Sequence, residues 1–231
     1  MLVQISDPHL RLGPDDQGSA AALAAAVERV LALPTPPDAV LLSGDIADSG
    51  SRAEYDLARE LLAPLPMPVH LLAGNHDRLP ERTSYAVRCG ELRLIACDTT
   101  LPGEDGGRLD VAWLEARLAE NPQAPTIVAM HHHPVPIGIP WLDRIGLPDD
   151  DRAALAELLR RSPQVRRIVA GHVHRTSHAT LGGCPVVTCT GTNWQAKLEF
   201  GATTMEVTHE PPSLLVHALV GGELVTHVQP V

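Results

Sequence analysis

"VHLLAGNHD", residues 69 to 77, joins an apolar run of strand length to a glycine and three polar residues. Gly74 and Asn75 are common in tight turns because both tolerate a left-handed backbone. Asn75, His76 and Asp77 also offer an amide, an imidazole and a carboxylate, and such groups bind metal ions. The stretch therefore predicts a strand followed by either a turn or a metal site, and the rest of the chain has to separate the two.

Four other apolar runs of strand length end in the same kinds of residue. The segments that follow them are Asp7-Pro8-His9, Gly44-Asp45-Ile46-Ala47-Asp48, His131-His132-His133-Pro134 and Gly171-His172-Val173-His174. In an open α/β sheet the carboxyl ends of the strands line one crevice, so the five tips can converge there. Each motif alone is explained as well by a turn, a helix cap or an exposed strand. Five chance motifs have no reason to occupy successive strand ends, and we predict a centre that holds two cations.

The bulk composition is that of a globular protein of 231 residues, 44% of them hydrophobic. This length is enough for one domain with a sizeable core. The net charge of -10 argues against binding a nucleic acid polymer, and no run is long and apolar enough to span a membrane. The four cysteines form no C-x-x-C pair and the N-terminal residues do not resemble a signal peptide, so we expect reduced core thiols and a cytoplasmic location.

The order of apolar and helical patterns indicates an α/β fold. Strands are expected at 2–6, 39–43, 69–73, 92–98, 126–130 and 166–170, and helices at 19–33, 51–65, 110–120 and 150–162. Asp110 is a plausible cap for the third helix. From about residue 176 the chain turns into short β-type runs that suggest a β-meander. We predict a single domain over residues 1–231, with two packed β-sheets and helices outside.

The ordered motifs D-x-H, G-D-x-x-D, G-N-H-D, H-H-P and G-H-x-H run from Asp7 to His174. This order resembles the calcineurin-like metallophosphoesterase superfamily, and within it the class III cyclic-nucleotide phosphodiesterases and their glycerophosphodiesterase relatives. A weaker similarity continues to about Gln195. The resemblance implies a four-layer α/β/β/α sandwich of two mixed sheets.

The resemblance also implies a ligand set. Asp7, His9 and His174 would hold one metal, Asn75, His132 and His172 the other, and Asp45 would bridge them. His132 is chosen by anchoring the family's His-His-Pro-Pro pattern on Pro134, although Val135 replaces the second proline. Whether His131 or His133 contributes to the site stays open.

By the same resemblance, Asn75 and His76 contact the phosphate, His76 protonates the leaving oxygen, and Asp48 orients His76. The activity implied is hydrolysis of 3′,5′-cyclic nucleotides or small phosphodiesters by a hydroxide that bridges two Mn²⁺, Fe²⁺ or Zn²⁺ ions. The alternatives are a pyrophosphatase or phosphomonoesterase with the same metals, and a metal-binding regulator without catalysis. The β-rich C-terminal quarter offers strand edges through which a homodimer could form.

Several residues outside the five motifs are further candidates. Trp141 lies in a Gly- and Pro-rich loop and could stack on a base, although a single Trp in a loop is more often a packing residue. Asn193 and Trp194 lie in a segment that resembles the position where relatives place pocket residues. We interpret Arg11 and Arg78 as solvated surface cations in preference to phosphate ligands. The five histidines outside the motifs lie in strand-like runs without partner motifs, and we interpret them as structural.

Overall fold

Two β-sheets form the centre of the computed structural model, which describes residues 1–16, 18–79 and 84–231. Sheet 1 has the strand order β13-β12-β1-β2-β3. Its strands are β1 (Leu2–Ile5), β2 (Ala39–Ser43), β3 (Val69–Leu72), β12 (Ser213–Val220) and β13 (Glu223–Pro230). Strands β1, β2 and β3 are parallel, whereas β12 is antiparallel to both β1 and β13, so the sheet is mixed.

Sheet 2 has the strand order β4-β5-β6-β7-β9-β8. Its strands are β4 (Tyr85–Cys89), β5 (Leu92–Cys97), β6 (Thr126–Met130), β7 (Val165–Ala170), β8 (His178–Leu181) and β9 (Cys184–Thr188). Strands β5, β6, β7 and β9 are parallel, and β4 and β8 pair antiparallel at the two edges. A small separate ribbon joins β10 (Gln195–Ala196) to β11 (Val207–Thr208).

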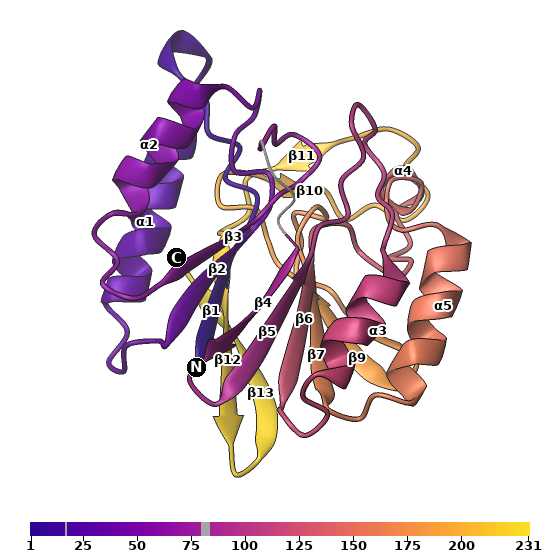
Figure 1. Ribbon diagram of the computed structural model, residues 1–231. Coiled ribbons are helices and arrows are strands. Elements are labelled where there is room, and N and C mark those ends of the chain that lie inside the picture. The colour runs from indigo at the N-terminus through magenta and orange to yellow at the C-terminus, as the bar shows by residue number, and fades with distance from the viewer. Residues whose placement is uncertain (17, 80–83) are drawn as a thin grey trace.

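Helices cover the outer face of each sheet (Figure 1). Sheet 1 carries α1 (Ser19–Leu31) and α2 (Arg52–Leu62), and sheet 2 carries α3 (Val111–Ala119) and α5 (Asp149–Arg160). A short 3-10 helix (Gly13–Asp15) and α4 (Pro140–Asp143) lie in loops. Asp110 caps α3 as predicted, because its carboxylate accepts a hydrogen bond from the backbone N–H of Trp113.

The core follows from the two-residue period of the strands. Val3 and Ile5 point toward α1 and α2, whereas Leu2 points into the layer between the sheets. In sheet 2, Ile95 faces α3 and α5, and Leu94 faces the same inner layer. The α/β/β/α sandwich predicted from the sequence is confirmed. In the described parts of the chain, no helix has both the length and the apolar character needed to cross a membrane.

The C-terminal quarter differs from the meander expected from the sequence. Its strands divide between the two sheets, because the hairpin of β8 and β9 extends sheet 2 and the hairpin of β12 and β13 extends sheet 1. The elements β4, α4 and β10 were also not expected from the sequence, and they are short or lie beside Gly- and Pro-rich loops. These elements depend on long-range pairing and packing, which local patterns do not record.

Candidate metal centre

The carboxyl ends of β1, β2, β3, β6 and β7 meet at one edge of the sandwich, as the sequence predicts. Three groups of metal-capable side chains form there, with ligand atoms within 4.8 Å of one another in each group, and one of them consists of His9, Asp48 and His76. The other two share Asp45 and are the candidate ligand groups. The first of these contains Asp7, His9, Asp45 and His174, and the second contains Asp45, His131 and His172. Asp45 belongs to both groups, so its carboxylate lies where two ions could share it.

The backbone at these tips is strained. Among the described residues, five that are not glycine have positive φ: Asp7, His9, Asp45, His172 and His174, with φ between 44° and 66°. Such a conformation costs on the order of 1–3 kcal/mol per residue and persists only where the surroundings impose it. All five are predicted metal ligands, so the strained positions coincide with the candidate centre.

Two glycines let the tips approach each other. A Cβ on Gly44, whose φ is 104°, would lie 2.1 Å from Nδ1 of His131. A Cβ on Gly171 would lie 2.4 Å from Oγ of Ser6 and 2.8 Å from a carboxylate oxygen of Asp7. No side chain fits at either position without moving a residue of the centre, and this explains why a glycine precedes Asp45 and His172.

Three imidazoles are held in the same way. Nδ1 of His9 contacts a carboxylate oxygen of Asp48 at 3.2 Å, Nδ1 of His131 contacts the Ser43 carbonyl at 2.9 Å, and Nδ1 of His174 contacts the Trp194 carbonyl at 3.1 Å. A carbonyl or carboxylate can only accept, so each Nδ1 carries the proton. Each Nε2 is then left with a lone pair, which is the arrangement that outer partners impose on metal-binding histidines.

These lone pairs face one another and the carboxylates. Nε2 of His9 lies 3.1 Å from Nε2 of His174, and a carboxylate oxygen of Asp45 lies 3.3 Å from His9 and 3.4 Å from His131. Two lone pairs at this distance repel unless a proton or a cation lies between them. Nε2 of His172 is also buried and has no hydrogen-bond partner among the residues that the structure describes. The arrangement therefore calls for positive charge at this point.

The pKa values also show that positive charge is favoured at these positions. Burial lowers the pKa of His9 and His131, but the Asp45 carboxylate outweighs it and raises their pKa values to about 10 and about 9. Burial opposes ionisation of Asp7 and Asp45, yet His174 and His131 respectively hold their pKa values below the ordinary range. The acids therefore retain protons on the imidazoles, and a cation would compete for the same positions.

The structure differs from the sequence prediction within the histidine run. His132 has both ring nitrogens engaged: Nε2 lies 3.1 Å from the Asp105 carbonyl and Nδ1 lies 2.7 Å from Oγ1 of Thr99. Since the carbonyl fixes the proton on Nε2, Nδ1 accepts from Thr99 and no lone pair is free. His131, whose contribution the sequence left open, belongs to the group with Asp45 and His172, and its Nε2 lies 3.2 Å from the side-chain oxygen of Asn75.

His133 lies behind the centre. Its ring stacks on that of His172, with 5.8 Å between the centroids, and within the described parts of the chain neither ring nitrogen has a hydrogen-bond partner. Burial lowers the pKa of His133 to about 4, so this ring is neutral. His133 belongs to none of the three groups of metal-capable side chains.

His76 and Asp48 are neighbours, but their contact is not the one expected. Nδ1 of His76 donates to the backbone carbonyl of Asp48 at 2.9 Å, whereas the Asp48 carboxylate is 3.9 Å away. That carboxylate instead holds His9 and forms an ion pair with Arg11 at 3.0 Å. Hydrogen bonds from His9, then from Arg11, lower the pKa of Asp48 to about 2. Arg11, interpreted from the sequence as a solvated cation, is therefore part of the site.

Asp77 is a residue of the site that sequence reasoning passed over. Its buried carboxylate accepts hydrogen bonds from the backbone N–H groups of Gly74, Ile46 and Ala47 and from the hydroxyl of Tyr55. It thereby joins the loop after β2 to the loop after β3. The signal was its place as the last letter of G-N-H-D, a motif read for its amide and imidazole.

A hollow of about 420 Å³ opens over the centre, and we call it the site hollow. His9, Asp45, His76, His172 and His174 form its floor, and its walls include Arg11, Trp141, Arg144, Trp194 and Met205. Trp194 stacks on His174 with 3.7 Å between the ring centroids. Trp141 and Trp194 thus lie where the sequence placed pocket residues. Asn193 is not among the residues that line the hollow, and Arg78 instead donates to the carbonyls of Asn75 and Asp77.

Comparison with known proteins gives the family. A sequence model described as calcineurin-like phosphoesterase matches residues 1–176. A glycerophosphodiester phosphodiesterase of Enterobacter lignolyticus is 33% identical over 98% of this chain and 90% of its own length. A 3′,5′-cyclic adenosine monophosphate phosphodiesterase of Pseudomonas aeruginosa is 36% identical over 76% of this chain and 70% of its own length.

Solved structures agree on the fold. A dimetal phosphatase from Danio rerio superposes with a TM-score of 0.69 at 17% sequence identity, and the match covers 99% of this chain and 98% of that one. The family resemblance drawn from the five motifs is confirmed. The chain belongs to the calcineurin-like phosphoesterase family and is a phosphoester hydrolase.

Proposed function

We propose that the protein hydrolyses small phosphodiesters with two divalent cations. Asp7, His9 and His174 would hold one ion, Asn75, His131 and His172 would hold the other, and Asp45 would contact both. The observation that carries the proposal is the position of Asp45, which is shared by two adjacent groups of buried ligands. A shared carboxylate is the usual means of keeping two catalytic cations close together.

The donor set fits cations of intermediate softness. Imidazole nitrogens and carboxylate and amide oxygens suit Mn²⁺, Fe²⁺ and Zn²⁺, and all four cysteines lie outside the two ligand groups. The facing Nε2 atoms of His9 and His174 and the unpartnered Nε2 of His172 support a cation at each position. When bound, two such ions activate water and neutralise the charge that develops on a phosphoryl group.

His76 and Asn75 would bind the phosphate and manage the proton. Because Nδ1 of His76 donates to the Asp48 carbonyl, its Nε2 is free, and this half-exposed ring is on the floor of the site hollow. The backbone N–H of His76 donates to Asp45 at 2.9 Å, so the backbone that carries the ring is fixed to the candidate bridging carboxylate. In this position a proton on Nε2 could pass to the departing oxygen.

The relatives support diesters as the substrate class. Those compared above are named for glycerophosphodiester and cyclic adenosine monophosphate hydrolysis. The hollow of about 420 Å³ suits a small ligand, and the net charge of -10 argues against a nucleic acid polymer. A pyrophosphatase or phosphomonoesterase with the same residues is the second candidate, and a silent metal-binding regulator is the third.

One set of parallel assays separates these candidates. Metal-depleted protein reloaded with Mn²⁺ would be given bis-p-nitrophenyl phosphate, 3′,5′-cyclic AMP, glycerophosphocholine, p-nitrophenyl phosphate and pyrophosphate. Hydrolysis of the first three in preference to the last two is the expected result. Preference for p-nitrophenyl phosphate or pyrophosphate would replace the proposal with the second candidate, and inactivity on all five would replace it with the third.

Three further expectations remain part of the proposal. A single domain over residues 1–231 is supported by the C-terminal strands, because they pair within both sheets. A cytoplasmic location is supported by four buried cysteines in the free state. Sedimentation analysis would test the homodimer.

A further inference from the structure

A line of polar side chains crosses the apolar layer between the two sheets. It starts on the C-terminal hairpin and ends at the metal centre, and its members are Thr226, His217, Gln4, Ser43, Ser6 and Asp7. Five of the six are fully buried, among neighbours such as Leu2, Leu41 and Leu215. Burying polar groups in such a layer is unfavourable unless each finds a partner, and here each does.

The direction of the hydrogen bonds is fixed by a backbone carbonyl. Nε2 of Gln4 donates to the Ala170 carbonyl at 3.1 Å and to Oγ of Ser43 at 2.8 Å. The carbonyl can only accept, so the oxygen of the Gln4 amide must face His217, whose Nε2 lies 3.4 Å away. His217 therefore carries its proton on Nε2, and its Nδ1 accepts from the hydroxyl of Thr226 at 2.9 Å.

The remaining links continue in the same direction. The Asp7 carboxylate can only accept, so the Ser6 hydroxyl donates to it and the oxygen of Ser6 accepts from the Ser43 hydroxyl at 2.7 Å. The Ser43 hydroxyl also lies 3.3 Å from the Ile5 carbonyl. Every donor in the line points toward Asp7, and successive hydrogen bonds of one direction polarise and strengthen one another.

The other contacts of Asp7 show why this matters. Its carboxylate also accepts from the backbone N–H of His172 at 3.0 Å, and one of its oxygens lies 3.4 Å from Nε2 of His174. The Ser6 hydroxyl thus holds one oxygen while the other faces the first ligand group. The backbone N–H of His172 also lies 3.2 Å from the oxygen that Ser6 holds, so removing the hydroxyl takes away one of the two donors that fix this oxygen.

We propose that Gln4 and His217 are positioning residues that act through Ser43 and Ser6 to orient the Asp7 carboxylate toward its cation. By this inference the hairpin of β12 and β13, which lies beyond the residues matched by the family model, contributes to the metal affinity of one ligand group. The inference rests on the proposed metal centre. It assigns a function to His217, which the sequence analysis interpreted only as structural.

The test measures Mn²⁺ affinity at each ligand group separately, by calorimetric titration of metal-depleted protein. A His131→Ala background leaves the group of Asp7, His9 and His174 intact, and a His9→Ala background leaves the group of Asn75, His131 and His172. In the first background we expect Ser6→Ala and Gln4→Met to weaken Mn²⁺ binding by roughly tenfold, at the lower end of the effect of outer partners. His217→Leu should weaken it less, by roughly threefold, because its link to Gln4 is the longest.

In the His9→Ala background the same three substitutions should leave Mn²⁺ affinity unchanged. Val187→Ala is the matched control, because Val187 lies in the same inner layer but outside the polar line. It should lower the midpoint of thermal unfolding and leave both affinities unaltered.

Three results would overturn the inference. Unchanged affinity of Gln4→Met in the first background would show that the line does not act on Asp7. Equal weakening in both backgrounds, matched by Val187→Ala, would show a general loss of packing. If neither background binds Mn²⁺ while Gln4 is present, the proposed metal centre itself is refuted, and the inference falls with it.

Discussion

A hollow lies at each end of strand β7. The site hollow at its carboxyl end has a volume of about 420 Å³, and the hollow at its amino end, which we call the arginine hollow, has about 400 Å³. Arg160, Arg166 and Arg167 line the arginine hollow together with the turn between β8 and β9 and the first residues of β13, Glu223 and Leu224. In size the two are nearly equal.

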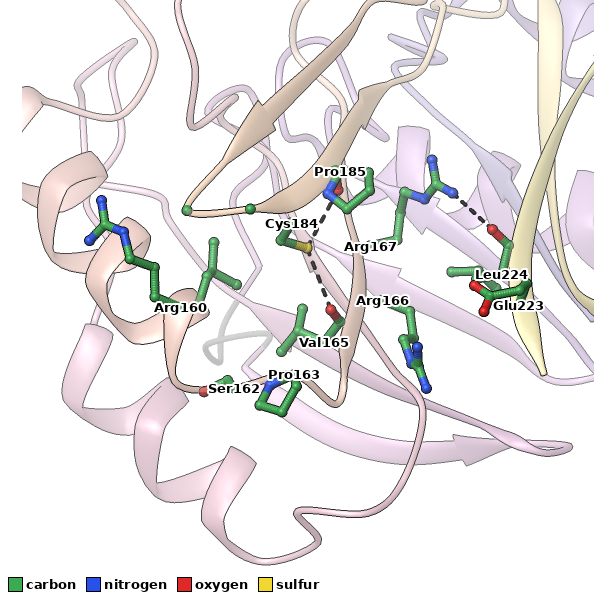
Figure 2. A pocket seen from close by; sticks show the side chains of 13 residues that line it. Arg160, Ser162, Pro163, Val165, Arg166, Arg167, Cys184, Pro185, Glu223 and Leu224 are labelled. Atoms are coloured by element: carbon green, nitrogen blue, oxygen red, sulfur yellow. Dashed lines mark hydrogen bonds between the residues drawn. The ribbon is translucent and has the colours of Figure 1, made fainter.

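Their side chains are arranged in opposite ways. Figure 2 shows the guanidinium groups of Arg160, Arg166 and Arg167 pointing in three directions, with Arg167 directed to the carbonyl of Leu224 at 3.0 Å. The thiol of Cys184, between them, donates a hydrogen bond to the carbonyl of Val165, and burial raises the pKa of this thiol to about 11. At the carboxyl end, by contrast, imidazoles and carboxylates that follow five strands form three overlapping groups, and the ligand atoms within each group lie within 4.8 Å of one another.

The backbone separates the two ends as well. The turn at the arginine hollow adopts its left-handed conformation at Gly182 and Gly183, where this costs little. The site hollow adopts it at Asp7, His9, Asp45, His172 and His174, where each residue is strained. Converging ligands and a strained backbone therefore mark the functional end of β7, and volume does not.

The largest expected effect is at the point of convergence. Asp45→Asn keeps the shape of the side chain but removes the charge shared by the two ligand groups. Both ions should be held more weakly, and phosphodiesterase activity should fall by at least about 10³-fold, because the cations supply several kcal/mol of transition-state stabilisation. Elemental analysis and a steady-state assay with bis-p-nitrophenyl phosphate would measure both. A variant with two tightly bound ions and wild-type turnover would contradict the proposed centre.

The next effect separates two neighbouring histidines. His131→Ala should remove one ion and lower activity by roughly 10²–10³-fold, because a ligand lone pair is lost. His132→Ala should retain both ions and at least about a tenth of the activity, because the ring of His132 is engaged by Thr99 and Asp105. Metal content measured on both purified variants decides between them. The reverse order of effects would restore the ligand predicted from the sequence.

The histidine run also shows how far sequence reasoning reaches. The strand before it was predicted with the bounds that β6 has, Thr126–Met130. His131 is the first residue after that strand, and its carbonyl still pairs with the backbone N–H of Gly171 at 3.1 Å. Counting from the strand end gives His131, whereas counting back from Pro134 gave His132. The end of β6 fixes the position of His131 beside the other strand ends, whereas Pro134 lies farther along the loop.

Other features could not be predicted because they join distant segments. Pairing of β1 with β12 brings Gln4 near His217, two residues separated by most of the chain. No local pattern records such a pairing, so the two C-terminal hairpins were read as one meander. The five tips were predictable for the opposite reason, because each follows its own strand directly and parallel strands place their carboxyl ends together.

A smaller effect concerns His217, which lies on β12 and contacts Gln4 of the polar line. Burial and the nearby charge of Arg167 lower its pKa to about 3, below the ordinary value of 6.5. As the pH falls below roughly 6, His217 is protonated in the unfolded chain but stays neutral in the folded protein. The free energy of unfolding therefore decreases by about 1.4 kcal/mol for each pH unit. Between pH 7 and pH 5, the free energy of unfolding of His217→Leu should decrease by about 2 kcal/mol less than that of the wild type.

Urea unfolding at both pH values, with metal-depleted protein, measures this difference. The variant and the wild type share every other titrating histidine, so the difference isolates His217. Equal losses would mean that His217 is protonated in the folded protein. Its Nδ1 would then be unable to accept from Thr226, and the direction of the polar line would be wrong.

The smallest expected effect is at the arginine hollow, and it tests whether the diverging arginines there lack a bound ligand. Arg166 is exposed, and its guanidinium group diverges from those of its neighbours (Figure 2). Arg166→Ala should therefore leave kcat/KM within about twofold of the wild type and change the free energy of unfolding by no more than about 0.5 kcal/mol. Diverging cations do not share a bound anion, so sulfate should raise the melting temperature of both proteins equally. A larger rise of the melting temperature in the wild type would show that Arg166 helps to bind sulfate. Side chains that diverge in the unliganded protein could then still form a binding site, and the comparison of the two hollows would be wrong.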